Sequence, residues 1–224
     1  LHRRCAASLV CTYLKQPAHR FFTTSISNFK QCAGGLPDGA SRAATLVQLL
    51  YDRAQDDDAP WPRAVAQLDT SNAFNAIGRA PVFDCFTGVA SRIYDNGNVQ
   101  TGENILSLPA LKPFFPYVKS MLSVSNDNRF FDHKGQLHLI RGTTGLQQGD
   151  PLLMQIYSAA THPIWARIMA RSPTTHGVGI ADDAFLEDEF PRVLHTLADA
   201  IKSFRTDADL EMQPTKLKIH IKGV

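Results

Sequence analysis

Two short apolar segments of this chain each end in acidic residues, and this pattern constrains the fold more than any other feature of the sequence. Residues 64–68 (AVAQL) are followed by Asp69, and residues 177–181 (GVGIA) are followed by Asp182 and Asp183. Short apolar runs of this kind are typical of buried strands, so both segments would carry their carboxylates to the end of a sheet. The sequence therefore predicts that three carboxylates gather at one place if these strands pair.

A carboxylate cluster of this kind needs a compensating cation, because like charges repel at short range. It can hold two divalent cations, the arrangement that transfers nucleotides by in-line attack at phosphorus. A solvent-exposed hairpin tip is the alternative interpretation of the adjacent pair. Adjacent acids are weak evidence by themselves, since residues 56–58 form a second acidic run with no apolar strand beside it. We interpret that second run as a solvated loop.

Composition excludes several classes of protein. The chain has 224 residues, 44% of them hydrophobic, which suffices for one large domain or two small ones. No apolar run approaches bilayer length, so no membrane partner is expected. The four cysteines show neither a Cys-x-x-Cys pair nor histidines at zinc spacing, which predicts reduced thiols. We therefore expect a nuclear or cytoplasmic protein that is not secreted, with an organelle transit peptide at the start of the chain as an alternative.

The net charge of +2 conceals an uneven distribution along the chain. Residues 1–50 carry six Lys or Arg residues and one acid, whereas acids gather at residues 52–58 and 182–189. A basic first part that faces an acidic centre suits a polyanion held against bound metal ions. A solvated basic helix explains this feature equally well.

Hydrophobic periodicity and turn residues predict an α+β fold with a mainly antiparallel sheet, backed by helices on one side and preceded by a helical region. The expected strands are residues 64–69, 178–181, 185–186 and 217–221, with a hairpin over 129–140. The expected helices are residues 1–15, 40–50, 79–94, 104–123 and 150–171, with an interruption near Pro113 and Pro116 in the fourth and a break near Pro163 in the fifth. A sixth helix is expected to begin at Pro191 and to bury Leu194, Leu197, Ala198 and Ile201.

Three strings of residues occur in an order that resembles a known enzyme family. They are residues 68–77 (LDTSNAFNAI), 141–152 (RGTTGLQQGDPL) and 180–183 (IADD). In this order and at these separations they resemble motifs A, B and C of the reverse transcriptase palm, with the greatest similarity to enzymes of non-LTR retrotransposons. Residues 31–39 and 210–216 resemble the same family, so the resemblance covers nearly the whole chain.

The resemblance implies an RNA-directed DNA polymerase, which transfers a nucleotide from dNTP to the 3′-hydroxyl of a DNA primer on an RNA template. Residues 1–62 would be part of the basic, mostly helical fingers, and residues 63–224 would be the palm with motifs A to D. The family's thumb and endonuclease are absent from the sequence, so we expect a fragment. A polymerase without its thumb holds duplex weakly, so this fragment alone would have little activity.

The resemblance also assigns roles to the acidic residues and to one lysine. Asp69 and Asp182 would bridge two Mg²⁺ ions, for which Mn²⁺ could substitute, and Asp183 would be a supporting ligand. Lys216 matches the motif D lysine, which would donate a proton to the departing pyrophosphate or stabilise its charge. A solvated surface lysine is an equally good interpretation of Lys216.

Three further residues would bind the nucleotide or template. Phe74 matches the aromatic gate that would clash with a 2′-hydroxyl, and packing in the core is the alternative for this ring. Gln148 would form hydrogen bonds at the nucleotide or template, and Gly149 would allow close backbone approach. The alternative for this segment is a turn that leads into a helix capped by Asp150.

Two positions depart from the family pattern. Ile180 stands where an aromatic residue is usual, and Asn75 stands where many relatives carry a second acid. Neither change removes an expected metal ligand. Two other functions stay open: a template-dependent RNA polymerase, which uses the same acids, and a catalytically inactive polymerase fold that binds RNA.

Overall fold

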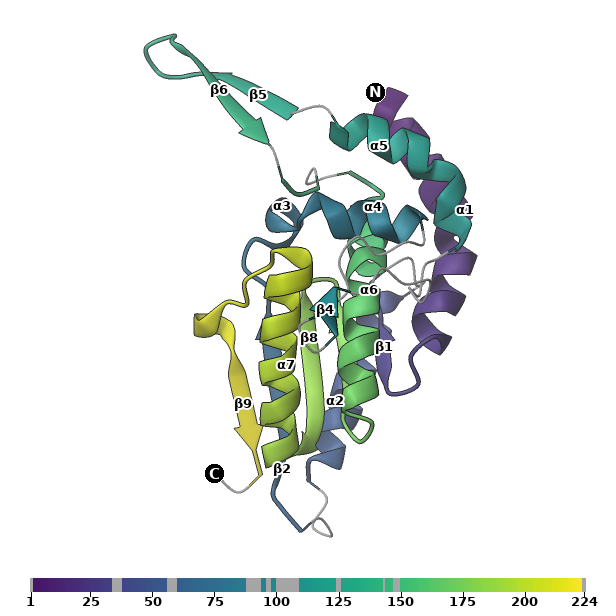
Figure 1. Cartoon of the computed structure of the whole chain (residues 1–224), viewed down its shortest axis with the longest axis vertical. Helices are drawn as coiled ribbons and strands as arrows, with labels where there is room; N and C mark the ends of the chain where they lie inside the picture. The colour runs from purple at the N-terminus through teal and green to yellow at the C-terminus, as the bar shows by residue number, and fades with distance from the viewer. Residues whose placement is uncertain are drawn as a thin grey trace.

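A five-stranded sheet forms the centre of the molecule (Figure 1). The computed structural model describes residues 2–33, 38–55, 60–87, 94–95, 98–99, 109–123, 126–142, 144–146 and 150–222. Across the sheet, the strands are β1 (Phe29–Gln31), β7 (His176–Ile180), β8 (Asp183–Glu189), β2 (Arg63–Asp69) and β9 (Lys218–Ile221). Strands β1 and β7 are parallel and the other neighbours are antiparallel, which confirms the predicted α+β fold with a mainly antiparallel sheet.

The helices and two small ladders surround this sheet. Two-stranded ladders are formed by β3 (Tyr94–Asp95) with β4 (Asn98–Val99) and by β5 (Asn126–Phe131) with β6 (Leu137–Gly142). The helices are α1 (His2–Thr24), α2 (Gly39–Arg53), α3 (Ala73–Ala76), α4 (Arg79–Thr87), η1 (Pro109–Phe114), α5 (Phe115–Ser123), α6 (Leu153–Arg171), α7 (Phe190–Ala208) and η2 (Pro214–Lys216).

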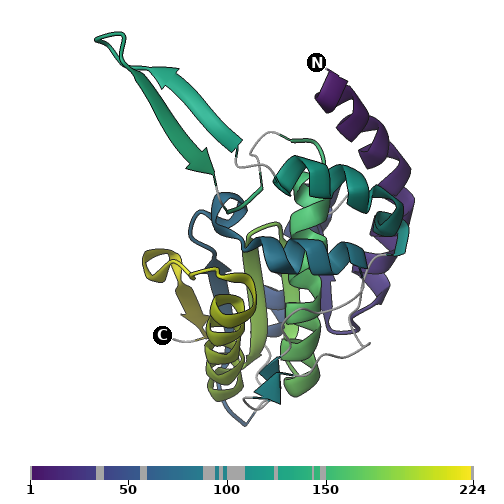
Figure 2. The same ribbon diagram turned by 45° about the horizontal axis from the view of Figure 1, so that its top comes forward.

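Helices cover both faces of the sheet. Ala66 and Leu186 belong to the large core that includes α6 and α7, whereas Val65 and Val178 pack with α2 on the opposite face. Helix α4 lies across one end of α6 and carries α5 on its outer side (Figure 2). The expectation of helices on one side only was therefore wrong. A one-sided sheet alternates buried and exposed positions, but consecutive residues 64–66 of β2 are all buried.

Two prolines lie inside helices that the sequence predicted to end or break. Helix α1 passes Pro17 and continues to Thr24. Helix α6 runs through Pro163 to Arg171. A proline removes one backbone hydrogen bond from a helix. In α1 the burial of Ala18 and Phe22 beyond the proline offsets that loss, because both side chains are inaccessible to solvent.

Strand β1 was missed from the sequence because it is short and partly polar. Its side chain Phe29 is fully buried and stacks on Trp165, with the ring centroids 4.5 Å apart. A Cβ atom on Gly177 of the neighbouring strand would lie 2.5 Å from Phe29 Cδ2, so this approach requires glycine. Strand β1 places part of residues 1–62 in the same sheet as residues 63–224. The division into fingers and palm at this boundary stays a prediction.

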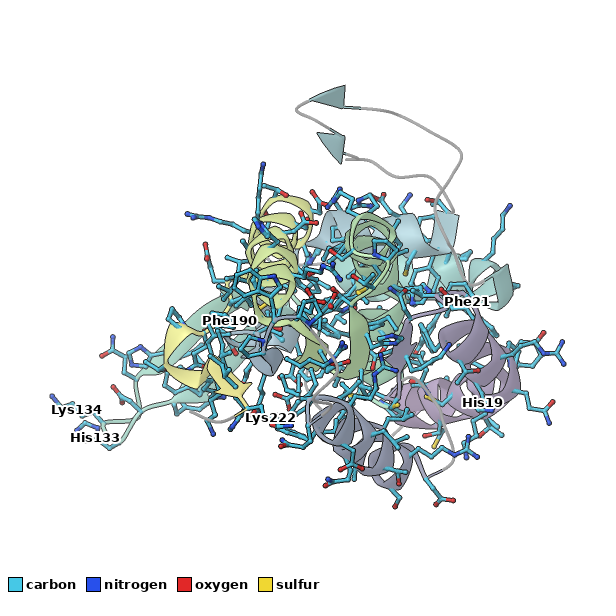
Figure 3. The ribbon with its side chains drawn as sticks, turned by 90° about the horizontal axis from the view of Figure 1, so that it is seen from below. His19, Phe21, His133, Lys134, Phe190 and Lys222 are labelled. Atoms are coloured by element: carbon cyan, nitrogen blue, oxygen red, sulfur yellow. The ribbon has the colours of Figure 1, made fainter. Side chains whose placement is uncertain are left out.

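The other expected elements are largely present. The hairpin is formed by β5 and β6, and its turn, with His133 and Lys134, lies at its outer end away from the helices (Figure 3). The turn between β7 and β8 consists of Ala181 and Asp182, so Asp183 already belongs to β8. Helix α4 ends at Thr87. Residues 88–93 and 104–108 of the predicted helices lie outside the described residues, and so does the predicted acidic loop at residues 56–58. None of the described helices is long and apolar enough to cross a bilayer.

Helix α7 buries a different face from the one predicted. Val193, Leu197 and Phe204 are buried, whereas Leu194 is 38% exposed and Ile201 is 36% exposed. Ala198 is exposed as well, so Leu197 is the only buried residue of the four that were expected in the core. Consecutive helical residues are separated by about 100°, so an assignment that is wrong by one residue selects a neighbouring stripe of the helix.

This correction makes a testable prediction about stability. Leu197→Ala should lower the free energy of unfolding by about 2–5 kcal/mol, because it leaves a cavity in the core. Leu194→Ala is the matched control on the same helix, and it should lower this free energy by less than about 1 kcal/mol. Urea denaturation of the three proteins measures both effects. Equal losses for the two variants would show that α7 does not bury the face described here.

Candidate active site

The pairing of β2 with β8 brings the three predicted acids together. Asp69 is the last residue of β2 and faces Asp183, the first residue of β8, across the antiparallel ladder. Side chains that face each other in such a ladder leave the same side of the sheet, with Cβ atoms about 4.5–5.5 Å apart. Asp182 lies in the turn immediately before Asp183. The three acids therefore lie at one end of the sheet, as the two apolar segments predicted.

The surroundings of Asp182 and Asp183 disfavour the negative charge of these two groups. Burial raises the pKa of Asp182, and the neighbouring charge of Asp69 raises it further. Burial also raises the pKa of Asp183, and both Asp182 and Asp69 add to this effect. Lys216 acts in the opposite direction on both groups. This place favours the arrival of positive charge, because three acids share the field of one lysine.

Lys216 lies directly on the acidic cluster. Its Nζ atom is 2.6 Å from Asp69 Oδ2 in an ion pair. This hydrogen bond raises the pKa of the Lys216 ammonium. The segment before Lys216 is held against β2 because the Gln213 N–H donates to the Asp69 carbonyl oxygen at 2.9 Å. The structure thus places the predicted lysine beside the predicted acids, and the backbone of Asp69 fixes the position of the segment that carries this lysine.

The acids have the donor chemistry of a site for a hard cation. Magnesium and manganese prefer carboxylate oxygens, and Asp69, Asp182 and Asp183 supply them at one edge. In the part of the chain that the structure describes, no three His, Cys, Asp or Glu side chains are already arranged to hold a metal ion. Lys216 takes up an oxygen of Asp69 in this arrangement. These three acids could hold such an ion once the lysine moves and their side chains turn toward each other.

Two residues that were not predicted from the sequence, Thr70 and Tyr157, support this cluster through hydroxyl contacts. The Thr70 hydroxyl donates to the Asp182 carbonyl oxygen at 3.0 Å, and it lies 3.4 Å from the Tyr157 hydroxyl. Tyr157 is 1% exposed, and burial raises the pKa of its hydroxyl well above the ordinary value. Thr70 could have been suspected because it follows Asp69. Tyr157 gave no such signal, since only the packing of α6 under the sheet brings it there.

Phe74 packs beside Tyr157 at the edge of the core. Its ring centroid is 4.9 Å from that of Tyr157, and the half-buried ring packs against the main core. These contacts agree with the alternative role in packing, and the role of Phe74 at the nucleotide stays a prediction. The Phe74 carbonyl oxygen accepts the Leu146 N–H at 2.6 Å, and the Ile77 carbonyl oxygen accepts the Gly145 N–H at 2.9 Å.

This contact joins the segments around Asp69 and around the expected nucleotide site. A Cβ atom on Gly145 would lie 2.2 Å from the Asn75 carbonyl oxygen, so only glycine allows the two segments to approach this closely. Gln148 and Gly149 themselves lie outside the described residues. Beyond them, Asp150 Oδ1 accepts the Leu152 N–H at 2.9 Å, but α6 begins only at Leu153 and its N-cap is Leu152, so the prediction that Asp150 caps this helix was wrong.

Comparison with known proteins gives a structural answer but no match in sequence. No family model and no curated protein matches the sequence. Telomerase from Candida albicans, in complex with a TWJ fragment of telomeric RNA, superposes with a TM-score of 0.60 at 13% identity over 96% of this chain. Candida tropicalis telomerase gives a TM-score of 0.64 at 11% identity over 97% of this chain in its complex with a TWJ fragment. The apo form gives 0.58 at 11% identity over 98%.

The chain therefore shares the fold of the matched part of these telomerase structures. It spans about a third of the telomerase chains, since it covers 35%, 34% and 36% of their lengths. At identities this low the similarity concerns the fold alone. Any activity is therefore a matter for the site residues of this chain.

The raised pKa values of Asp182 and Asp183 make a prediction about stability. A carboxyl whose pKa is higher in the folded than in the unfolded state destabilises the fold when it is ionised. This loss grows as the pH rises through those pKa values and vanishes below the unfolded value of about 4. Asp183→Asn should therefore raise the free energy of unfolding at pH 7 by up to about 1 kcal/mol, a small gain because the group is partly solvated.

Denaturation by urea without divalent cations, between pH 4 and pH 7, measures this difference. The gain should shrink as the pH falls. Asp52→Asn is the control, since Asp52 is an exposed acid on α2 whose carboxylate accepts a hydrogen bond from the Gln48 side chain, and this variant should change little. A variant Asp183→Asn that is less stable than the parent at pH 7 would contradict the proposed charge repulsion.

Proposed function

We propose that this chain is the fingers and palm part of an RNA-directed DNA polymerase from a retroelement of the non-LTR type. The observation that carries the proposal is the pairing of Asp69 with Asp183, beside Asp182, within a polymerase-like fold. The ordered strings at residues 68–77, 141–152 and 180–183 support the same assignment. Two of the similar telomerase structures contain a fragment of telomeric RNA, which supports RNA as a partner of this chain.

The acids and the lysine divide the work of nucleotidyl transfer between them. Asp69 and Asp182 would hold two Mg²⁺ ions, with Asp183 as the supporting ligand on the facing strand. The chemistry that such ions would supply there is a lower pKa of the primer 3′-hydroxyl and neutralisation of the dNTP triphosphate. Lys216 is protonated at neutral pH, because its pKa is raised by Asp69. Its positive charge would stabilise the departing pyrophosphate, and the same ammonium would be the group that donates a proton to it once the hydrogen bond to Asp69 is released.

Phe74 would select the sugar of the incoming nucleotide. Its ring is braced by Tyr157, and its backbone is fixed by Leu146, so it cannot move aside freely. A braced ring beneath the sugar would clash with a 2′-hydroxyl and favour dNTP over rNTP. Gln148 and Gly149 would bind the nucleotide or template.

Loss of one carboxylate tests the polymerase assignment. Asp182→Asn keeps the size of the side chain and removes its charge, so primer extension with Mg²⁺ should fall by more than about 100-fold, beyond the loss seen for outer-shell partners of metal sites. The assay uses the full-length protein that carries these residues, an RNA template, a DNA primer and dNTP. Asp52→Asn should extend the primer at the parental rate.

The outcomes separate the alternatives. Equal extension by the parent and by Asp182→Asn would refute the metal role of this acid. Binding of RNA without extension by any of the proteins would favour a catalytically inactive polymerase fold that binds RNA, and would overturn the proposed activity.

Replacement of Phe74 tests the choice of sugar. Phe74→Ala should raise the use of rNTP relative to dNTP by at least about ten-fold, because it removes the clash with the 2′-hydroxyl, and the ratio of kcat/KM values measures this change. Phe115→Ala is a control, since it removes another half-buried ring, on α5, that packs against Phe83 and Phe86. A parental enzyme that uses rNTP as well as dNTP would point to an RNA polymerase and contradict the proposal.

A further inference from the structure

The turn that presents Asp182 has a conformation that its sequence does not favour. Ala181 has a φ angle of +58°, in the left-handed region. An L-residue with a Cβ atom rarely adopts this region, because Cβ approaches the following carbonyl oxygen. Alanine has no side-chain polar group that could compensate by a local hydrogen bond. Contacts from elsewhere in the structure must therefore hold this turn.

One such contact comes from Gln31, at the end of β1. Its Oε1 atom accepts the Ala181 N–H at 3.3 Å and the Ala33 N–H at 3.2 Å. Gln31 faces Gly179 across the parallel pair of β1 and β7, and the Cys32 N–H donates to the Gly179 carbonyl oxygen at 2.7 Å. The register of the two strands thus fixes Gln31 beside the turn that follows β7.

The space around Gln31 is shaped for a side chain of this length. Gln31 is 1% exposed. A Cβ atom on Gly179 would lie 3.0 Å from Gln31 Nε2 and 2.9 Å from Phe29 Cζ, so the glycine leaves the room that the glutamine occupies. Within the described residues, Nε2 is buried without a hydrogen-bond partner. Because an unpaired buried amide is unfavourable, the use of an amide here is explained by its oxygen rather than by packing.

The turn is held from a second side as well. The Thr70 hydroxyl donates to the Asp182 carbonyl oxygen at 3.0 Å, and Thr70 directly follows Asp69. The N–H of the first turn residue and the carbonyl of the second are therefore both bound by side chains from other strands. Thr70 connects the turn to β2, and Gln31 connects it to β1.

We propose that Gln31 is a positioning residue, whose side-chain oxygen holds the turn of Ala181 and Asp182 in the left-handed conformation that presents Asp182 beside Asp69 and Asp183. Its effect on catalysis rests on the proposed polymerase function. Its effect on the turn does not, since the contacts belong to the chain alone. Gln31 touches no reacting group and acts through the position of the aspartate.

Gln31→Met tests the hold on the turn, because it keeps the length of the side chain and removes the oxygen. Amide hydrogen exchange of the free protein should show a faster rate at Ala181 by at least about ten-fold, since its N–H loses an acceptor. The amide of Cys32, bound to the Gly179 backbone, should be unchanged. Gln155→Met is the matched control: it replaces another buried glutamine, on α6, and should leave the Ala181 rate as it is.

Primer extension by the full-length protein tests the consequence for catalysis. Gln31→Met should lower kcat by roughly 10- to 100-fold with little change in the KM for dNTP, because the misplaced acid affects the reacting geometry rather than binding. Ala181→Gly removes the strain of the left-handed turn. In that background, Gln31→Met should lower kcat by less than about three-fold, which a general loss of stability would not produce.

Each result decides one of the two proposals. An unchanged Ala181 exchange rate in Gln31→Met overturns the positioning role, and so does an equal loss of kcat in both Ala181 backgrounds. Faster exchange together with no primer extension by the parent protein overturns the polymerase assignment and leaves the hold on the turn in place. If Gln31→Met does not fold, Gln31→Asn replaces it, since this variant withdraws the amide oxygen by one methylene.

Discussion

The antiparallel pairing of β2 with β8 is the constraint on which the rest of this structure depends. It aligns seven residue pairs from Arg63 opposite Glu189 to Asp69 opposite Asp183, and a shift by one residue would turn every side chain to the other face. The register that buries Ala66 and Leu186 in the core is therefore the register that sets two acids against each other. Burial of apolar surface along the ladder offsets the repulsion at its end, so the sheet carries an acidic site that would not assemble on its own.

Different elements of the fold position the different functional groups of this site. The β9 side of β2 brings Lys216 to Asp69, the segment at Gly145 locks the backbone beside Phe74, and Thr70 and Gln31 hold the turn that carries Asp182. The charges of Asp182 and Asp183 oppose folding, because burial and the repulsion of neighbouring acids act on the same groups. Such opposition between local stability and chemistry is common where a site must attract a cation or a charged substrate.

Local patterns in the sequence were informative wherever one element explains them. The structure contains the strand that ends at Asp69, the hairpin predicted over residues 129–140 and the helix predicted to begin at Pro191, since apolar runs and turn residues act over a few positions. Predictions that depended on neighbours in space were less successful. The buried face of α7 was wrong, β1 was missed, and the second helical layer at α2 was not expected. A helix with apolar residues on adjacent stripes does not reveal which stripe meets the sheet.

The sequence by itself determined the identity and order of the acidic groups, the apolar strands that carry them and the mixed α+β class, because residue type and periodicity are local properties. Only the tertiary structure decided that Lys216 lies on Asp69, that Tyr157 supports Phe74, and that Gln31 reaches the turn at Ala181. Those contacts join residues that are far apart along the chain. Their formation depends on strand register and on the packing of both faces of the sheet, which no short segment of sequence encodes.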